Sequence, residues 1–422
     1  MRILMVTNLY APDECGGAQT ISDLAEALAA RGHEVTVRTA YPYYPEWRDK
    51  SGRNGLAVRR ERWHGVAVER YGLHIPGRPG RLTGRALQEG SFFLSLARSL
   101  PRGRHDVALV YCPLMGAVAF GALHRLLRRT PALLCVQDLP VEAAVIGGIL
   151  AGGLLARLLG GAQHWLFGRY SAWRSIHRVM AEQLASCGGR RVFLIPDWLH
   201  LTLAQAIASL PPRSERPAGN PLRLLYSGNV GGKQGLPDFC RMLRKCRIDF
   251  SFRINGAGCG MTQLREVVDS DQRLVLGELT TEAEFARALH WADLYVVTEL
   301  PAGATFFPSK TIPSMAAGTP ILAVSNKHSP LGVEMRTHGL GPWLPWERVG
   351  ELEALLGAIT PEALARWRTA ALERSRYYDR NRCIDRFEEA LLAVATGRSL
   401  PPADLVPHPH VRPKADPSHV AA

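Results

Sequence analysis

The sequence predicts an α/β protein with two Rossmann-like domains, each a doubly wound parallel sheet, that face a common cleft. Three observations lead to this prediction. The chain has 422 residues, which is enough for two domains of ordinary size. Short apolar runs alternate with helical patterns along most of it. Residues 208–221 are rich in Pro, Ser and charge, as linkers are, and divide these runs into two series.

The first series begins at the N-terminus. Its apolar runs lie at 2–7, 34–39, 107–111 and 132–137. The helical pattern of Ile21, Leu24 and Leu28 lies between the first two runs, which gives the strand, loop, helix, strand order of a parallel sheet. We therefore expect a first domain over residues 1–205 and a linker over 206–221.

The second series has the same alternation. Its apolar runs lie at 222–226, 250–254, 274–276, 294–297 and 320–324, and 282–292 is helical between two of them. Residues 361–395 have a charged helical pattern that is interrupted at Tyr377–Asp379. We expect the second domain over 222–378, and a final helix over 379–396 that crosses back to the first domain. The Pro-rich tail, 397–422, is predicted to be disordered.

The net charge of +13 favours an anionic partner, such as a phosphate or a membrane surface. Residues 1–200 hold 25 Lys and Arg against 15 Asp and Glu, whereas the remaining 222 residues hold 26 against 23. Aromatic residues do not form a stripe interleaved with arginine, so we expect no nucleic-acid partner. Only six of the 51 basic residues are lysine, so a lysine within a motif is informative.

The eight cysteines form no CxxC pair and no zinc-ligand spacing with histidine, which fits a reduced, cytoplasmic compartment. The N-terminus enters a strand directly and does not resemble a signal peptide. The uncharged, glycine-rich run Ala143–Ala156 is too short to span a bilayer. The apolar stretch Val145–Leu159 is flanked by arginines, and it fits either contact with an anionic lipid surface at the inner face of the cell membrane or a buried helix pair.

The first candidate site follows the run at 222–226. The loop YSGNVGGKQG, 226–235, carries four glycines, which let the backbone approach a ligand, and it leads into a helix near Pro237. Free N–H groups at that helix start and the charge of Lys233 predict a cradle for a diphosphate. The alternative interpretation is a flexible glycine turn with a surface lysine.

The second candidate site is TFFPSKTIPSMAAG, 305–318, ahead of the run at 320–324. Pro308 stiffens the backbone, while Ser309 and Lys310 can hydrogen-bond to a phosphate and neutralise it. The small residues that end this segment predict a helix that packs closely on the sheet. The alternative is a surface lysine on the first turn of a core helix.

Two weaker candidates lie in the first domain. Gly16 and Gly17 would admit a ligand beside a helix start near Ile21, although glycine pairs are common in loops. Gln137 and Asp138 end the run at 132–137, where the Asp138 carboxylate would bind hydroxyl groups, act as a base or cap the following helix.

Two further patterns are discounted. Asp269-Ser-Asp271 has the DxD spacing of a metal motif but stands in a polar turn after a helical run, so we expect no metal site. The loop GAGCG, 256–260, is not GxGxxG, and no acidic residue completes a dinucleotide fingerprint. We retain Gly256 and Gly258 as candidate contacts to the base or sugar of a nucleotide.

The chain resembles retaining glycosyltransferases of the GT-B fold, glycosyltransferase family 4, and more narrowly the branch that includes the colanic-acid-type exopolysaccharide fucosyltransferases. The segment LYSGNVGGKQGL, 225–236, is the most specific part of this resemblance. The other residues that carry it are PYYPEW (42–47), Gln137-Asp138 with Val141-Glu142, Pro196-Asp-Trp198 and Pro308-Ser-Lys310.

The resemblance implies transfer of a sugar from a GDP- or UDP-linked donor, held by the C-terminal domain, to an acceptor held by the N-terminal domain. The acceptor would be a saccharide or a polyprenyl-diphosphate-linked sugar, and the reaction would retain stereochemistry without a cofactor or bound metal. Loop amides and cations would stabilise the departing diphosphate. We assign catalytic roles to Lys310, Lys233 and Asp138. Donor contacts are expected at Gly16, Gly17, Gly228, Asn229, Gly231, Lys233, Gln234, Gly256, Gly258, Pro308, Ser309 and Lys310.

The chain also departs from the family's pattern. Many members carry two glutamates ahead of the small-residue helix, an Arg and a Lys in the phosphate loop, and a histidine in the strand-end motif. The matching positions here are Thr305, Pro313, Asn229, Gln234 and Gln137. Lys233 and Lys310 are therefore expected to share the diphosphate.

Two alternatives stay open from the residues alone. A GT-B-like sugar-nucleotide epimerase would use the same cleft, but that chemistry needs acid–base groups, and the strand-end loops offer few beyond Asp138 and Glu299. A non-catalytic assembly subunit with a decayed donor site would account for Thr305 and Pro313.

Overall fold

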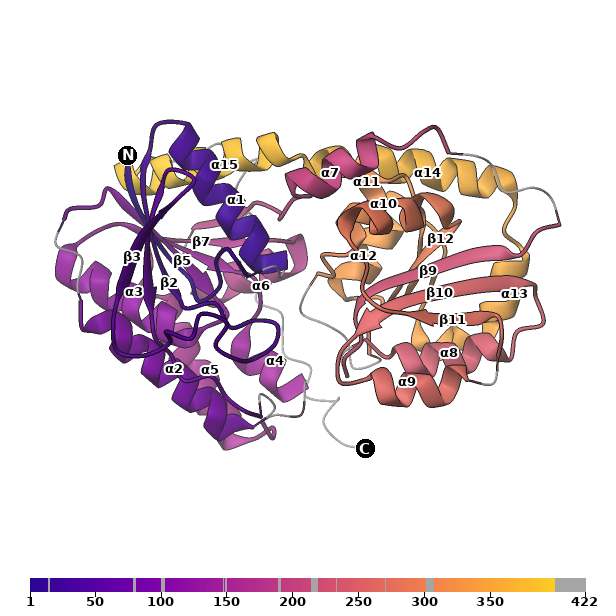
Figure 1. The fold of residues 1–422 in the computed structure, drawn as a ribbon, viewed down its shortest axis with the longest axis horizontal. Coiled ribbons are helices and arrows are strands. Elements are labelled where there is room, and N and C mark those ends of the chain that lie inside the picture. The colour runs from indigo at the N-terminus through magenta and orange to yellow at the C-terminus, as the bar shows by residue number, and fades with distance from the viewer. Residues whose placement is uncertain are drawn as a thin grey trace.

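The computed structural model describes most of the chain up to residue 398. The described residues are 1–13, 16–78, 81–99, 103–146, 148, 150–188, 191–213, 219–232, 234–269, 271–300 and 307–398. The predicted disordered tail beyond 398, the cation of Lys233 and the family position Thr305 lie outside these residues. The predicted fold class is confirmed: two mainly parallel sheets with helices on both faces form two domains (Figure 1).

The N-terminal sheet has the strand order β3-β4-β2-β1-β5-β6-β7-β8, and β3 is antiparallel to its neighbour. Its strands are β1 (Arg2–Val6), β2 (Glu34–Ala40), β3 (Arg59–Trp63), β4 (Val66–Tyr71), β5 (Val107–Cys112), β6 (Ala132–Val136), β7 (Ala172–Ser175) and β8 (Arg191–Leu194). Its helices are α1 (Gly16–Ala30), α2 (Leu82–Ala97), α3 (Met115–Arg128), α4 (Pro140–Ile146), α5 (Leu154–Phe167) and α6 (Arg178–Gly188).

Alternation along the central strand sets the two layers of this domain. Leu4 and Val6 of β1 pack on the side covered by α2, α3 and α5, whereas Ile3 and Met5 pack on the other side, against α1. Successive strand side chains point to opposite faces, so a strand that is apolar throughout is buried on both. The apolar run at 2–7 predicted this double burial.

The C-terminal sheet has the order β11-β10-β9-β12-β13-β14. Its strands are β9 (Leu222–Asn229), β10 (Phe250–Ala257), β11 (Leu274–Gly277), β12 (Leu294–Thr298), β13 (Ile321–Val324) and β14 (Trp343–Leu344). Its helices are α8 (Leu236–Arg244), α9 (Met261–Val268), α10 (Glu282–Trp291), α11 (Thr311–Ala316), α12 (Pro330–His338), α13 (Leu352–Gly357) and α14 (Pro361–Ser375), with 3₁₀ turns at Trp346–Glu351 and Arg376–Tyr378. β9 is central and ends in the first candidate site.

The last helix, α15 (Arg380–Thr396), packs on the N-terminal sheet. Its buried residues Phe387 and Leu391 belong to the same core as β1 and α1. Asp23 of α1 accepts three hydrogen bonds of 2.6–3.0 Å from the Arg380 guanidinium, and it also accepts one from the Trp198 indole at 2.7 Å. The chain therefore ends its described part on the domain in which it began (Figure 1).

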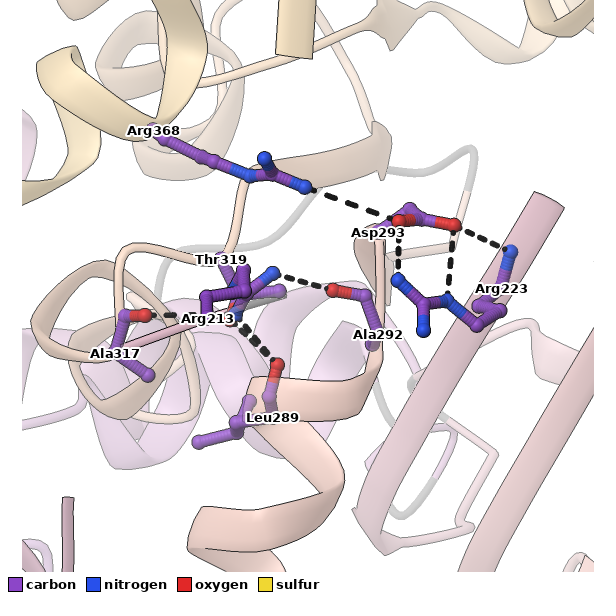
Figure 2. Close-up of polar contacts among 8 residues, drawn as sticks. All are labelled: Arg213, Arg223, Leu289, Ala292, Asp293, Ala317, Thr319 and Arg368. Atoms are coloured by element: carbon purple, nitrogen blue, oxygen red, sulfur yellow. Dashed lines mark hydrogen bonds and ion pairs between the residues drawn. The ribbon is translucent and has the colours of Figure 1, made fainter. Parts of the chain in front are cut away.

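The segment between the sheets is fixed to the C-terminal domain. Helix α7 (Leu201–Ala208) falls partly within the predicted first domain but packs against α10 and α11, so the change of domain occurs before α7 rather than at 205. Beyond α7, Arg213 donates to the carbonyl groups of Leu289 and Ala292 and to the Thr319 hydroxyl at 2.6–2.8 Å (Figure 2). This part of the predicted linker is anchored by the half-buried Arg213 guanidinium.

Within the described residues, no helix is both long enough and apolar enough to cross a lipid bilayer.

Candidate functional site

The two C-terminal motifs meet at the carboxyl end of β9. Gly228 has φ = +132°, and a side chain at this position would begin 3.5 Å from the Lys310 Nζ. That φ strongly favours glycine, so the backbone here depends on the residue type. Two motifs separated by some eighty positions in the sequence therefore form one site.

Lys310 is held with its ammonium group inside the protein. It stands at the N-cap of α11, and Nζ lies 3.9 Å from the centre of the Tyr226 ring. This nitrogen is buried and has no hydrogen-bond partner among the described residues. Burial lowers the pKa of Lys310 to about 7. A buried cation without a counter-ion is unfavourable, so the pocket around Nζ is suited to an anion.

Tyr226 is a site residue that the motif analysis did not single out. Its ring lies against the Lys310 ammonium. Its hydroxyl donates a hydrogen bond to the Asn229 carbonyl at 2.6 Å, which fixes the start of the glycine loop. The residue is fully buried on β9, and an aromatic residue in a buried strand is ordinary. No sequence signal therefore separates this tyrosine from other core aromatics.

The segment before Lys310 lies where the two domains meet. Phe307 stacks on Tyr378 with an interplanar angle of 4°, and its centroid lies 6.4 Å from that of His177 in the N-terminal domain. Pro308 is buried and its carbonyl accepts from the Thr311 hydroxyl, whereas Ser309 is exposed. The side chain of Ser309 therefore lies at the surface, where its hydroxyl is available to a ligand.

The glycine loop is braced by its own side chains. Gln234 accepts a hydrogen bond from the Gly231 amide at 2.9 Å through Oε1, so this oxygen is engaged within the turn. Asn229 is exposed and Gly231 is partly buried. Lys233, which was expected to supply the second cation, lies outside the described residues.

The second glycine loop packs against the first. A side chain at Gly258 would begin 2.4 Å from the Asn229 Oδ1 and 2.6 Å from the Val230 carbonyl, and one at Gly256 would begin 2.7 Å from Val230 Cγ2. Strands β9 and β10 continue their pairing through Gly228 and Gly256. Gly256 and Gly258 thus allow the two loops to touch, which gives these glycines a packing reason besides the predicted donor contact.

Glu299 is a second buried titratable group at this end of the sheet. It follows β12, its amide donates to the Val324 carbonyl, and neither carboxylate oxygen has a hydrogen-bond partner among the described residues. Burial is the largest influence on the pKa of Glu299 and raises it to about 8. Glu299 is therefore protonated at neutral pH and can donate a hydrogen bond.

The N-terminal candidates are placed less distinctively. Gly16 and Gly17 open α1, and no atom lies within 4 Å of where a Gly17 side chain would begin. Close packing within the protein therefore does not explain Gly17. The nearby Asp13 is buried, with an oxygen 3.4 Å from Lys50 Nζ, and burial raises its pKa.

Asp138 and Gln137 both interact within their own domain. The Asp138 carboxylate accepts the amide of the next residue, Leu139, at 2.9 Å, just ahead of α4. A helix cap accepts an amide two or three residues further along, so this hydrogen bond is not a capping contact. The Gln137 amide lies 3.5 Å from Asp197, and the fully buried Arg174 holds Asp197 at 2.7 Å. The role of Asp138 toward hydroxyl groups stays a prediction.

The discounted DxD pattern has an internal explanation. Asp271 accepts three hydrogen bonds of 2.8–3.0 Å from the backbone and guanidinium of Arg273, and this pairing lowers its pKa. Its carboxylate closes a turn after α9.

A cavity of about 770 Å³ lies elsewhere, at the amino ends of β1 and β2. Its lining includes Arg2, Arg38, Arg98 and His105. None of the predicted donor or catalytic residues lines it. Ligands of doubly wound sheets bind at the opposite, carboxyl ends of the strands, so we do not assign the donor to this cavity.

Comparisons with known proteins show what this chain is similar to. Residues 16–198 match the family model of the glycosyl transferase 4-like domain. A protein of Escherichia coli strain K12, provisionally named a colanic acid biosynthesis glycosyl transferase (WcaI), is 28% identical over 350 residues, which cover 79% of this chain and 85% of that protein.

Solved structures share the whole fold at low sequence identity. Sucrose-phosphate synthase from Thermosynechococcus elongatus has a TM-score of 0.69 and 16% identity, covering 94% of this chain and 100% of that one. Anabaena HepE in complex with UDP and glucose has a TM-score of 0.64 and 15% identity, covering 93% and 100%. The fold is GT-B, and the chain is a glycosyltransferase related to an exopolysaccharide biosynthesis transferase.

Proposed function

We propose that this GT-B glycosyltransferase moves a sugar, with retention of configuration, from a nucleotide-diphosphate sugar to a saccharide or polyprenyl-diphosphate-linked acceptor. The product would be a surface polysaccharide or exopolysaccharide, made at the inner face of the cell membrane. The likeness to the Escherichia coli colanic acid transferase supports the pathway class. The Anabaena structure with UDP and glucose supports a nucleotide-linked donor.

The single observation that carries the proposal is the buried ammonium of Lys310, which lies next to Gly228 and has no hydrogen-bond partner among the described residues. In the transfer, the bond between the anomeric carbon and the diphosphate oxygen breaks, and the diphosphate gains negative charge. A preorganised cation in a water-poor site stabilises that charge strongly. The Tyr226 ring holds the ammonium in place by a cation–π contact without neutralising it.

The other groups of the site have roles consistent with this chemistry. Gly228 lets the diphosphate approach the backbone, and Lys233 would add the second cation. Protonated Glu299 would donate a hydrogen bond to the donor, either to a sugar hydroxyl or to a phosphate oxygen. Asp138, at the end of β6, would bind an acceptor hydroxyl. We propose no bound metal, because cations of the chain fill that role.

A donor screen tests the proposal directly. Purified protein is incubated with GDP- and UDP-sugars and a lipid-linked saccharide acceptor, and mass spectrometry follows the product and the released nucleotide. We expect nucleotide release to require acceptor, and to persist in EDTA. Release without acceptor would favour an epimerase or hydrolase, and loss of activity in EDTA would contradict metal independence.

Nucleotide binding separates a working donor site from a decayed one. Isothermal titration with GDP and UDP should give binding to one of them, and Lys310→Ala should weaken it by at least about tenfold, because one charge contact is lost. Lys245→Ala is the matched control, since Lys245 is an exposed lysine of the same domain. Absence of binding to either nucleotide would contradict the proposed donor site.

A further inference from the structure

The outer side of the N-terminal domain is formed by three neighbouring helices. α2 packs against α3, and α3 against α5, all on the same face of the sheet. Figure 1 shows them along the lower side of the N-terminal domain, opposite α1 and α15. We call their solvent-facing surface the three-helix face. Its charge and its apolar content both differ from those of an ordinary protein surface.

Large apolar side chains gather on the three-helix face. Of the sixteen exposed large hydrophobic residues in the described chain, ten lie on these helices. They are Leu82, Leu87, Leu94, Leu126, Leu127, Leu154, Leu155, Leu158, Leu159 and Trp165. Single exposed leucines need no explanation, but a concentration of this kind marks an interaction surface.

Helix α5 exposes leucines to solvent and buries a glutamine. Gln163 is buried, where its side chain accepts from the Val141 amide and donates to Glu142 at 3.0–3.1 Å. Leu154 and Leu158, by contrast, are 75% and 63% exposed. A helix of a water-soluble protein normally buries its leucines and exposes its glutamine. The inverted arrangement of α5 therefore suits an apolar environment outside the protein.

The charge on the same face has one sign. The three helices contain a single acidic residue, Glu89, which is half-buried and accepts the Gly116 amide at 2.7 Å. Exposed arginines border the leucines. They are Arg81, Arg98, Arg128, Arg129, Arg157 and Arg169. The guanidinium of Arg169 lies 4.2 Å from the centre of the Trp165 ring.

We infer that the three-helix face docks on the surface of an anionic lipid bilayer. Leucines would enter the acyl boundary, Trp165 would sit at headgroup depth, and the arginines would contact lipid phosphates. No helix here spans the bilayer among the described residues, so the contact is peripheral. The inference deepens the proposed function by naming the surface that brings the enzyme to a membrane-bound acceptor, but its test does not require catalysis.

Vesicle sedimentation of the full chain tests the inference. The probes are vesicles of phosphatidylcholine alone and of phosphatidylcholine with an equal part of phosphatidylglycerol. We expect binding to the anionic vesicles only, weakened by high salt because exposed charges are screened. The double variant Leu154→Glu/Leu158→Glu should bind at least about tenfold more weakly. The double variant Arg128→Glu/Arg129→Glu should lose about fivefold or more per arginine.

Matched controls keep the outcome decisive. Leu56→Glu/Leu279→Glu changes two leucines that are 79% and 53% exposed outside the face, and it should bind vesicles like the unmodified protein. Lys310→Ala should also bind, so loss of transfer and loss of docking are separable. Circular dichroism melting confirms that each variant is folded.

Three outcomes would overturn the inference. The first is that the unmodified protein does not bind anionic vesicles. The second is equal loss of binding in the control pair. The third is a dimer in light scattering that Leu154→Glu/Leu158→Glu dissociates, because the face would then cover a second copy of the chain.

Discussion

The two ends of the C-terminal sheet differ in the hydrogen-bond partners of their buried titratable side chains. At the amino ends of β9 and β12, the fully buried Asp293 accepts hydrogen bonds from the Arg223 guanidinium and amide at 3.0–3.3 Å, and Arg368 approaches it at 3.8 Å (Figure 2). At the carboxyl ends, Lys310 and Glu299 are buried with no hydrogen-bond partner in the described chain. Paired charge stabilises the domain, whereas the buried titratable groups Lys310 and Glu299 mark the end that we assign to the donor.

The largest effect on stability should come from removing Asp293, the buried counter-ion at the amino end of the sheet. Asp293→Ala leaves Arg223 and Arg368 without their buried counter-ion, so the free energy of unfolding should fall by about 3–5 kcal/mol. Urea titration measures it. The control is Asp238→Ala, because the Asp238 carboxylate is 60% exposed and pairs with Arg241 on the surface, where a pair contributes up to about 1 kcal/mol. Equal losses in the two variants would contradict the contrast.

Removing the Lys310 charge at the carboxyl end of the sheet should lower the transfer rate without destabilising the fold. Lys310→Met keeps the aliphatic stem and deletes the buried cation, so transfer should fall about 100- to 1000-fold, a loss of about 2.7–4 kcal/mol. The free energy of unfolding should stay equal or rise, because a desolvation cost is removed. Steady-state kinetics and urea titration at pH 7 measure both, with Lys245→Met as control. A matching loss of stability would make Lys310 structural.

The close approach of the two glycine loops can be tested at one atom. Gly258→Ala adds a methyl group 2.4 Å from Asn229 Oδ1 at φ = +134°, so stability should fall by about 1–3 kcal/mol. Gly232→Ala, in the first loop, has no atom within 4 Å of the new methyl group and should be close to neutral. Thermal melting of both variants decides whether close packing, rather than glycine content, shapes the site.

The smallest expected effect is a pH dependence of nucleotide binding. Burial holds the pKa of Lys310 near 7, and a bound diphosphate should raise it, so binding above pH 7 takes up a proton. Affinity should therefore fall as pH rises, by about fivefold between pH 7 and 8. Isothermal titration at both values checks this. Lys310→Met should remove the dependence, and an equal slope in that variant would assign the proton to another group.

Most strands of the sheets were predictable, and the exceptions have physical reasons. The nine apolar runs coincide with β1, β2, β5, β6 and β9–β13. β3, RRERW, is an edge strand with mostly exposed charged residues, so no apolar run marks it. β7, AWRS, carries Arg174. Its charge is buried only because the Asp197 carboxylate and the Ile195 carbonyl accept hydrogen bonds from its guanidinium. Such pairing joins distant residues and leaves no local pattern.

The candidate site was predictable as motifs but not as contacts. The Pro-Ser-Lys segment and the glycine loop were singled out from their residue types. That Lys310 reaches over Tyr226 to Gly228 depends on how the fold brings the start of α11 to the carboxyl end of β9. That Gln234 and Asp138 each spend an oxygen on a local amide also depends on the folded backbone. Composition indicates which groups are present, while packing decides which of them remain available to a ligand.

By itself, the sequence determined the two-domain α/β architecture and the loops that carry the chemistry. Strand burial and glycine or lysine placement are local properties, which a linear pattern records. Only the tertiary structure decided which charges stay unpaired, that the linker is anchored by Arg213, and that α5 turns its leucines to the outside. Pairing and exposure depend on neighbours brought together from distant parts of the chain, because burial is a property of the assembled fold.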